Sequence, residues 1–313
     1  MDTLDMTVAV PTYGRGPLVV ETVRHVLAQR PAAREILVAD QTPEHSQETQ
    51  GQLTAWHDAG IIRWLRLSEP SIPQAMNRAL RESSCATVLF LDDDVIPSPG
   101  LLAAHKGAYG AGPNVWAVVG QVLQPGESPG PALDTGPRSG LTADLHWPFR
   151  SDQRDWVRSV IACNLSVSRD RAVDIGGFDE NFVGVAFRFE TEFCRRVWSR
   201  GGRVLFVPEA SLRHLRTPSG GTRAYGQHLT SPSPMHGVGD YYFALRCGSG
   251  RERLVYMLRR PFREVRTRFH LVHPWWIPVK LVGELRALVL AFRLHRQGPR
   301  YIDRQARPAG GSV

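Results

Sequence analysis

Lysine is almost absent from this chain of 313 residues, which contains only Lys106 and Lys280. The four cysteines are far apart and form no CxxC pair, which argues against a zinc finger or a disulfide framework and predicts reduced thiols. The N-terminus does not read as a signal peptide, and no run of about 18 apolar residues predicts a membrane-spanning helix. We therefore expect a cytoplasmic globular protein, for which the 42% apolar content provides a packed core.

Acidic residues are scarce only in the last quarter of the sequence. Residues 1–240 hold 23 Arg or Lys against 26 Asp or Glu, a net charge of −3, whereas residues 241–313 hold 15 against 4, a net charge of +11. The overall charge of +8 therefore arises in the C-terminal part. This region has no nucleic-acid-binding motif and no interleaved aromatic residues, so we do not expect nucleic acid as a partner.

An amphipathic segment lies within this basic region, between residues 280 and 296. Its apolar residues fall on one helical face, with arginines on the flank and two tryptophans just before it. This pattern is typical of a helix that lies on a membrane surface, here the inner face of the cell membrane. A helix packed on the main domain, with its arginines in solvent, explains the pattern equally well. The residues are Leu281, Leu285, Leu288 and Phe292, then Arg286 and Arg293, then Trp275 and Trp276.

Strand and helix patterns alternate along the first 120 residues, which predicts an α/β fold with a doubly wound, mostly parallel sheet flanked by helices. The segment 124–150 is rich in Pro and Gly and predicts an irregular surface loop. We expect a main domain over residues 1–225 and a basic, mainly helical extension over residues 226–313. Strands are expected at residues 6–10, 35–40, 61–67, 87–91, 115–122 and 203–207, and helices at residues 17–29, 46–59, 71–82 and 101–109.

Three consecutive carboxylates, Asp92, Asp93 and Asp94, end the apolar strand predicted at residues 87–91. At the carboxyl end of a sheet strand, such oxygen ligands hold Mg²⁺ or Mn²⁺, and the ion in turn binds a diphosphate. A solvated acidic turn is the plain alternative. Two enzyme motifs also fit: the DxD of nucleotide-sugar glycosyltransferases, and the DxDx[TV] of haloacid-dehalogenase-type phosphatases. The phosphatase motif belongs on the first strand and needs a lysine beside a later acidic pair, and neither condition holds here.

Further motifs follow along the chain in a fixed order. The sequence reads VPTYGR at residues 10–15, CNLSVSRD at 163–170, IGGFDENF at 175–182 and FRFETEFCRR at 187–196, with Asp40 and the aspartate triplet after the first of them. Each motif alone is weak. The ordered set resembles the inverting family 2 glycosyltransferases of GT-A fold, and the resemblance covers residues 6–216.

This resemblance implies that a sugar-nucleotide donor lies against the ends of the first strands. Asp40 is expected to accept an N–H of the nucleobase and the Tyr13 ring to cover its face, although Asp40 can also simply cap the segment that follows it. Met76 stands where the family often has an arginine, so Arg78 or the arginines of a later loop are expected to contact the diphosphate instead. The residues assigned to the donor are Pro11, Thr12, Tyr13, Arg15, Asp40, Arg78, Asp92 and Asp93.

The resemblance also implies a metal site. Asp94 is expected to be the principal ligand, Asp92 to lie near both the ribose and the metal, and Asp93 to support the structure. His214, at the end of a late strand, resembles a histidine that completes the metal sphere, and Mn²⁺ tolerates such a ligand better than Mg²⁺ does. A histidine hydrogen-bonded at a strand end is the alternative.

An inverting transferase needs one carboxylate that takes the proton of the acceptor hydroxyl during its attack on the anomeric carbon. The resemblance assigns this role to Glu190, at the start of a helix, where the helix dipole favours the ionised form. Glu192, two residues further on, is the second choice. An ordinary acidic first turn, followed by Arg195 and Arg196, is the alternative for both.

These assignments predict a metal-dependent inverting glycosyltransferase of hexosyltransferase type with Mn²⁺ or Mg²⁺ as cofactor. Its expected partners are a nucleoside-diphosphate sugar, an acceptor glycan or lipid-linked sugar, as in polysaccharide biosynthesis, and a membrane surface. The alternatives are a catalytically silent protein that binds sugar nucleotides or docks on a membrane, and the phosphatase. The sequence carries no readable code for the sugar, the nucleobase or the acceptor.

Overall fold

The computed structural model describes residues 3–131, 139–143, 145 and 147–303. Its centre is a sheet with the strand order β3-β2-β1-β4-β8-β6-β9-β5, and β7 pairs with β9 outside this path. The strands are β1 (Thr3–Thr12), β2 (Ala32–Asp40), β3 (Arg63–Arg66), β4 (Thr87–Leu91), β5 (Val95–Pro97), β6 (Val115–Leu123), β7 (Asp155–Val157), β8 (Asn164–Ser168) and β9 (Arg203–His214).

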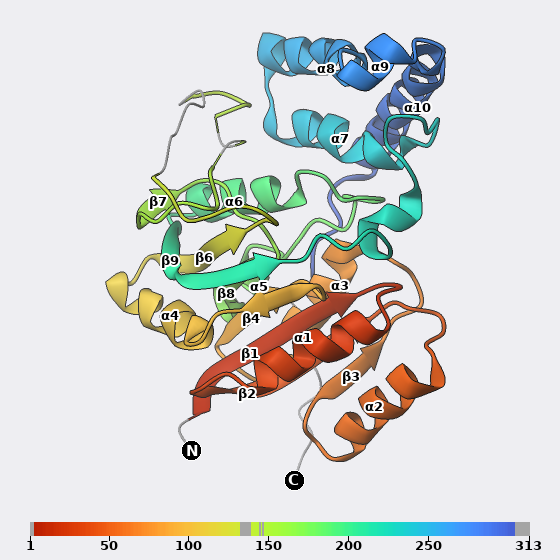
Figure 1. Ribbon diagram of the computed structural model, residues 1–313. Coiled ribbons are helices and arrows are strands. Elements are labelled where there is room, and N and C mark those ends of the chain that lie inside the picture. The colour runs from red at the N-terminus through yellow and green to blue at the C-terminus, as the bar shows by residue number, and fades with distance from the viewer. Residues whose placement is uncertain (1–2, 132–138, 144, 146, 304–313) are drawn as a thin grey trace.

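Helices cover both faces of this sheet (Figure 1). α1, α2 and α4 pack on one face, and α3, α5, α6, α7 and α10 contribute to the core on the other. The helices are α1 (Pro17–Leu27), α2 (Gln47–Asp58), α3 (Ile72–Glu82), α4 (Leu101–Ala108), α5 (Arg169–Asp174), α6 (Phe189–Ser199), α7 (Val238–Cys247), α8 (Gly250–Val265), α9 (Arg268–Val272) and α10 (Trp276–Gln297), with short 3₁₀ turns η1 (Tyr109–Ala111), η2 (Gly221–Tyr225) and η3 (Pro234–His236).

The sequence of β4 shows why this strand lies between two layers of helices. Val88 and Phe90 belong to the core on the α3 side, whereas Leu89 and Leu91 belong to the core on the α1 side, and all four are buried. Successive side chains of a strand point to opposite faces, so a strand buried on both faces reads as a continuous apolar run. The predicted α/β fold with a sheet flanked by helices is confirmed.

Parallel pairing is confined to two parts of the sheet. β3, β2, β1 and β4 are parallel to one another, and β6 is parallel to β9. β8 runs antiparallel to both of its neighbours, and β5 and β7 run antiparallel to β9. The prediction of mostly parallel strands therefore describes the N-terminal half of the sheet best.

The sequence predicted that two strands end near a proline, but both strands continue past it. β1 continues through Pro11 to Thr12, and its pairing with β4 already ends at Ala9, so the missing N–H of Pro11 removes no bond of that ladder. β9 bulges at Pro208, where its regular pairing with β6 is interrupted, and then resumes as far as His214. This extension of β9 brings His214 to the carboxyl edge of the sheet.

The C-terminal helices share a core with the sheet. Tyr241, Tyr242 and Phe243 of α7 are buried in the same cluster as Phe178 and Phe206. Packing is continuous across residue 225. The division expected there stays a prediction. Among the described residues, no helix is long and apolar enough to cross a membrane. The described parts of the segment 124–150 contain no helix or named strand, as expected.

Candidate active site

The carboxyl ends of β1, β2 and β4 meet at one edge of the sheet, beside a cavity of about 120 Å³. Ligands of open α/β sheets bind at such an edge. Six of the eight residues predicted to contact a donor line this cavity, and Asp40 and Arg78 do not. The six residues are Pro11, Thr12, Tyr13, Arg15, Asp92 and Asp93.

Asp40 lies behind the cavity wall and is fully enclosed by protein. Its Oδ2 atom is 2.6 Å from Nε2 of His45 and 2.8 Å from Nε1 of Trp64, and Arg66 also contacts it. The Oδ1 atom accepts the backbone N–H of Thr42 at 2.9 Å. The structure therefore places no oxygen of Asp40 toward the cavity, in line with the alternative that Asp40 holds the following segment.

Gln41, the next residue, lines the cavity instead. Its amide nitrogen donates to the backbone oxygens of Glu69 at 2.7 Å and Ser71 at 2.9 Å, which fixes the side chain and leaves its oxygen as an acceptor. Sequence reasoning missed Gln41, although its place at the end of β2 was the same signal that pointed to Asp40. Tyr225 of η2 also lines the cavity, and no motif marks that residue.

Arg78 points away from the cavity. Its Nε atom lies 3.0 Å from Oε1 of Glu82 on the solvent side of α3, whereas Ile72 and Met76 of the same helix line the cavity. Two helical positions separate Met76 from Arg78, a rotation of about 200°, so both cannot face one site. Arg15, in the turn between β1 and α1, is a cation that does line the cavity.

Asp92, Asp94 and His214 form a group that fits a divalent metal, with one ligand atom of each residue within 4.8 Å of the others. The pairing of β5 with the end of β9 sets Val95 opposite His214, so the histidine lies beside the carboxylates that follow β4. Nε2 of His214 is 3.5 Å from Oδ2 of Asp92 and 3.2 Å from Oδ1 of Asp94. All three predicted ligands are thus brought together.

The surroundings of Asp94 support this fit. Its Oδ2 atom accepts hydrogen bonds from Arg15 at 2.8 Å and from the Thr217 backbone and hydroxyl at 3.1 and 3.0 Å. Its Oδ1 atom is buried and makes no well-aligned hydrogen bond, which leaves a ligand position open. Nδ1 of His214 contacts Oε1 of Gln124 at 3.2 Å, an arrangement that leaves Nε2 to a metal.

The pKa values of Asp94 and His214 are shifted in the directions that are typical of a cation-binding site. Burial alone would raise the pKa of Asp94, but the hydrogen bond and charge of His214 and the charge of Arg15 lower it to about 2. Burial alone would lower the pKa of His214, but Asp92 and Asp94 raise it to about 9. A divalent cation would therefore replace the proton of His214 on binding.

Asp93 has a supporting position. Its side chain accepts the hydroxyl of Thr12 at 2.6 Å, and its backbone oxygen accepts the hydroxyl of Thr22 at 2.9 Å. Burial raises the pKa of Asp93 to about 7, although Arg15 and Thr12 oppose this. These bonds tie the end of β4 to β1 and α1, in agreement with the structural role expected for this aspartate.

Glu190, at the start of α6, borders the cavity. The backbone N–H of Ala162, which lines the cavity, donates to its Oε1 atom at 3.2 Å. The residue keeps some accessible surface, and the enclosure of its carboxyl group raises the pKa to about 7, with the charge of Asp92 acting in the same direction. Bonds to backbone N–H groups and the charge of Arg188 act against this rise.

Glu192 is held on another side of α6. Its two oxygens accept Nε and a terminal nitrogen of Arg196 at 2.8 and 2.9 Å, and the hydroxyl of Tyr301 lies 3.1 Å from Oε1. The residue is buried. Neither glutamate lines the cavity itself, but Glu190 is hydrogen-bonded to a residue that does, whereas the partners of Glu192 lie elsewhere.

The sequence model of glycosyl transferase family 2 matches residues 7–159 of the chain. Among curated proteins, a relative is the glucosyl-dolichyl phosphate glucuronosyltransferase of Haloferax volcanii, 23% identical over 225 residues, which are 67% of this chain and 69% of that protein.

Two solved structures are similar in fold. GalNAc-T7 with UDP, GalNAc and Mn²⁺ matches 93% of this chain at a TM-score of 0.58 and 14% identity, and the chain covers 55% of its length. The mannosyltransferase PcManGT of Pyrobaculum calidifontis, with GDP-Man and Mn²⁺, matches 94% of this chain and 79% of its own at a TM-score of 0.53 and 20% identity. At these identities the likeness concerns the fold, and it confirms the predicted GT-A architecture.

Proposed function

We propose that this chain, whose residues 7–159 match the model of glycosyl transferase family 2, is a metal-dependent inverting glycosyltransferase of that family. The donor is a nucleoside-diphosphate sugar, and the acceptor is a hydroxyl group. One observation carries the proposal: Glu190 is bonded to Ala162, which lines the cavity that Asp92 also lines. A base and a metal site thus border one cavity, as a direct displacement at the anomeric carbon requires.

The donor's nucleobase belongs at the end of the cavity formed by Tyr13, Gln41 and Tyr225. The free side-chain oxygen of Gln41 is placed to accept an N–H of the base, and the two tyrosine rings offer faces for stacking. This assignment replaces Asp40 by its neighbour. It leaves the identity of the base open, because an amide oxygen accepts an N–H of either uracil or guanine.

The diphosphate belongs beside Asp92, Asp94 and His214, which would hold Mn²⁺ or Mg²⁺. The cation, when bound, offsets negative charge on the leaving diphosphate. Arg15, whose guanidinium now neutralises Asp94 and which lines the cavity, contributes a second positive charge at the same end.

Glu190 acts on the acceptor. Its carboxylate takes the proton of the acceptor hydroxyl while the oxygen forms a bond to the anomeric carbon and the bond to the diphosphate breaks on the opposite face. A single displacement of this kind inverts the anomeric configuration. A pKa of about 7 suits the role, because about half of the groups are then ionised at neutral pH and the carboxylate is basic enough to accept the proton.

The acceptor we favour is a lipid-linked sugar or a growing polysaccharide at the inner face of the cell membrane. The name of the Haloferax relative contains a dolichyl phosphate, which supports a lipid-linked acceptor by analogy. The net charge of +11 on residues 241–313 supports a location near anionic lipid.

A donor panel followed by product analysis tests the proposal. Thermal unfolding is measured with UDP-, dTDP- and GDP-sugars and Mn²⁺, since a ligand at 100 times its dissociation constant stabilises the protein by about 2.7 kcal/mol. The donor found in this way is then used in transfer assays, and nuclear magnetic resonance of the product should show the anomer opposite to that of the donor. Retention of configuration would overturn the inverting mechanism.

The metal site is tested in the same assay with Asp94→Asn. We expect this variant to lose turnover and Mn²⁺-dependent donor stabilisation and to stay folded without ligand, because asparagine keeps a side-chain oxygen that can accept from Arg15 and Thr217. Asp58→Asn, at an exposed end of α2, is the matched control and should behave as wild type. Full activity in the presence of a chelator, or in Asp94→Asn, would contradict the assignment.

A further inference from the structure

α8 turns its charged side inward and its apolar side outward. On the inner side, Arg260 is only 3% exposed and pairs with acidic residues of α7, α8 and α10. On the opposite side, Leu254, Leu258 and Phe262 follow at four-residue spacing and are 53%, 59% and 69% exposed. A surface helix of a globular protein normally has the reverse arrangement.

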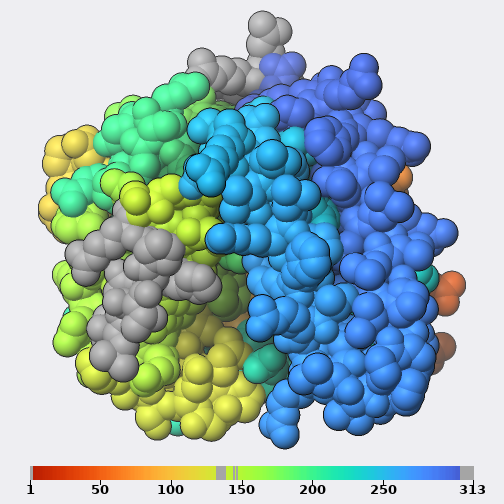
Figure 2. Space-filling view, turned by 90° about the horizontal axis from the view of Figure 1, so that it is seen from above, coloured from red at the N-terminus to blue at the C-terminus, as the bar shows by residue number. Residues whose placement is uncertain are grey.

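α10 repeats this inversion. Lys280 and Glu284 are buried on its inner side and lie 3.2 Å apart, whereas Leu285, Val289 and Phe292 are exposed on its outer side. α8 and α10 are in contact and lie side by side on one face of the molecule (Figure 2). Of the stripe predicted from the sequence, only Leu288 packs against the core, and the other three residues are exposed.

The connection between these helices is apolar as well. Leu271 and Val272 at the end of α9 are 79% and 68% exposed, and Trp275 follows them, also exposed. Tryptophan is a preferred residue at the boundary between water and lipid. The α8–α10 face, defined as the outer sides of α8 and α10 together with residues 271–275, is therefore largely apolar.

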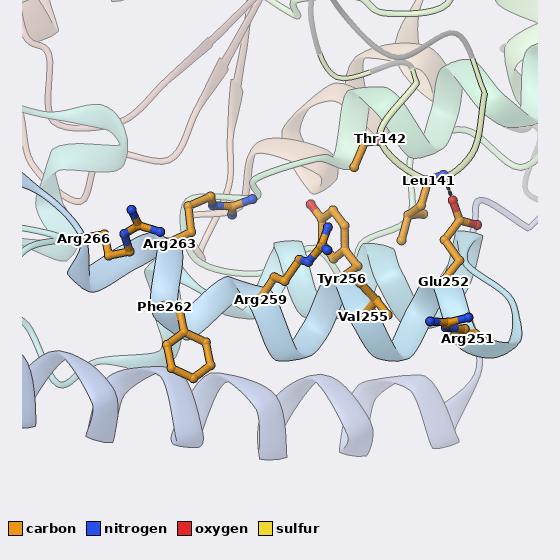
Figure 3. Close-up of a pocket in the computed structure, with 10 residues that line it drawn as sticks. All are labelled: Leu141, Thr142, Arg251, Glu252, Val255, Tyr256, Arg259, Phe262, Arg263 and Arg266. Atoms are coloured by element: carbon orange, nitrogen blue, oxygen red, sulfur yellow. Dashed lines mark hydrogen bonds between the residues drawn. The ribbon is translucent and has the colours of Figure 1, made fainter.

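Arginines flank this apolar surface. Arg251 and Arg259 of α8, and Arg266 just after its end, line a groove of about 1010 Å³ that Leu141 and Phe262 also line (Figure 3). Within the described parts of the chain, these three arginines have no carboxylate partner. Guanidinium groups of this kind bind phosphate groups well.

We propose that the α8–α10 face is a docking surface for an anionic lipid bilayer. The exposed Leu, Val and Phe side chains enter the boundary region of the bilayer, Trp275 lies at its edge, and the arginines contact lipid phosphates. The charge of the face excludes a second copy of the chain as the preferred occupant, because a symmetric contact would set unpaired arginines against one another. No helix of the described chain spans the bilayer, so binding is in the plane of the surface.

The proposal deepens the proposed function, on which its link to a lipid-linked acceptor rests, by naming the surface that would hold the enzyme at the membrane. Arg260 and Tyr256 of α8 bind Asp240 of α7, and Asp240 binds Nε of Arg188 at 3.2 Å, two residues before Glu190. The docking surface is thus connected to the start of α6 by one ion-paired cluster.

Vesicle co-sedimentation with the full-length protein tests this surface. The probes are vesicles of phosphatidylcholine alone and of phosphatidylcholine with phosphatidylglycerol. We expect binding to the anionic vesicles at low salt and only partial release at high salt, because the apolar part of the interaction is not screened. Leu258→Asn/Phe262→Asn should weaken the partition about tenfold to a hundredfold. Arg251→Gln/Arg259→Gln should weaken it about tenfold and make the binding less dependent on salt.

Ile61→Asn is the matched control, since Ile61 is 44% exposed between α2 and β3, away from the α8–α10 face, and should leave binding unchanged. The proposal would be overturned if the wild type did not bind anionic vesicles, or if the Leu258→Asn/Phe262→Asn variant bound them as well as the wild type does. It would also be overturned by light scattering that shows a dimer dissociated by the same double substitution. Asp94→Asn should bind vesicles normally, which separates a failure of docking from a failure of the proposed catalysis.

Discussion

Glu190 and Glu192 stand two positions apart on α6 and have different surroundings. Glu190 lies against Ala162 at the cavity, where enclosure makes its carboxyl group a better proton acceptor. Glu192 is engaged by Arg196 and Tyr301, an arrangement that stabilises the packing of α6 against the C-terminal segment. Two helical positions differ by a rotation of about 200°, so Glu190 and Glu192 point to different sides of α6. Glu190 is therefore available for a chemical role and Glu192 for a structural one.

Glu190→Gln should therefore lower turnover about 10²-fold to 10⁴-fold, because the amide keeps the shape of the side chain and removes the proton acceptor. Donor binding, measured by thermal shift with Mn²⁺, should stay near that of the wild type. The control is Glu192→Gln, which should keep turnover within about threefold and lower the free energy of unfolding by about 1–3 kcal/mol, since it weakens a buried ion pair. The opposite pattern in the two variants would move the base to Glu192.

The pKa of Glu190 gives a prediction for the pH dependence of the rate. Burial raises this pKa from its ordinary value to about 7, and a general base acts only when ionised. Hence kcat/KM should rise about tenfold per pH unit below pH 7 and level off above it. A steady-state profile from pH 5.5 to 8.5 at saturating metal checks this. A rate that is flat between pH 5.5 and 7, or that falls as the pH rises toward 8, would contradict the role of Glu190.

Residue patterns predicted the metal group better than the nucleobase contacts. Asp92 and Asp94 follow directly on the strong strand pattern of residues 87–91, so their place at the sheet edge could be inferred from the sequence, whereas Glu190 was assigned through the resemblance to the family. The surroundings of Asp40 could not be inferred from the sequence, because its contacts with His45 and Trp64 form only in the folded chain and no local motif marks them. The contact of Arg15 with Asp94 likewise joins residues far apart in sequence.

At the scale of elements, an ion pair joins the start of α6 to α7. Arg188 has a left-handed backbone, with φ of 77°, and its Nε atom lies 3.2 Å from Asp240 of α7. No side chain caps this helix, and the contact of Glu192 with Tyr301 is a second link between its first turn and the C-terminal segment. The positive charge of Arg188 also lowers the pKa of Glu190.

Arg188→Gln should consequently reduce kcat about tenfold and leave the KM for the donor nearly unchanged, because the base is less well placed while the cavity is intact. It should also move the acid limb of the kcat/KM profile to higher pH, since a charge that favours ionised Glu190 is removed. Arg263→Gln is the control: Arg263 also pairs with Asp240 but belongs to α8, and its loss should not move the pH profile. If the pH profile of kcat/KM is unchanged in Arg188→Gln, Arg188 has no effect on the ionisation of Glu190, and the Arg188–Asp240 pair is a structural contact alone.

Elements with clear periodicity were predictable, and those defined by distant pairing were not. The helices α1 to α4 and the strands β1, β2, β4 and β6 appear close to their expected positions. The three-residue strands β5 and β7 exist only because β9 pairs with them, and so carry too little pattern of their own. The sequence pattern did not predict α8, for another reason. Its apolar side faces outward and its inner side is charged, which is the reverse of the usual arrangement in a surface helix.

At the scale of the whole molecule, the C-terminal helices pack into one core with the sheet. Beyond the core that α7 shares with the sheet, Tyr242 donates a hydrogen bond to Asp179 at 2.8 Å and accepts one from Asn181 at 3.1 Å. Both partners belong to the family-like motif at residues 175–182. We keep the division at residue 225 as a proposal about function, with the transfer site before it and the docking surface after it.

This packing predicts one cooperative unfolding transition for the whole chain. Calorimetry should show a single peak, and hydrogen exchange should give amides in α7 and α10 protection similar to that of β4, because these elements share buried side chains. Tyr242→Phe should lower the free energy of unfolding by about 1–3 kcal/mol, since the buried carboxylate of Asp179 loses a donor, and should shift the whole transition without splitting it. Two separate peaks, with α7 and α10 exchanging long before β4, would show instead that residues 226–313 form an independent domain.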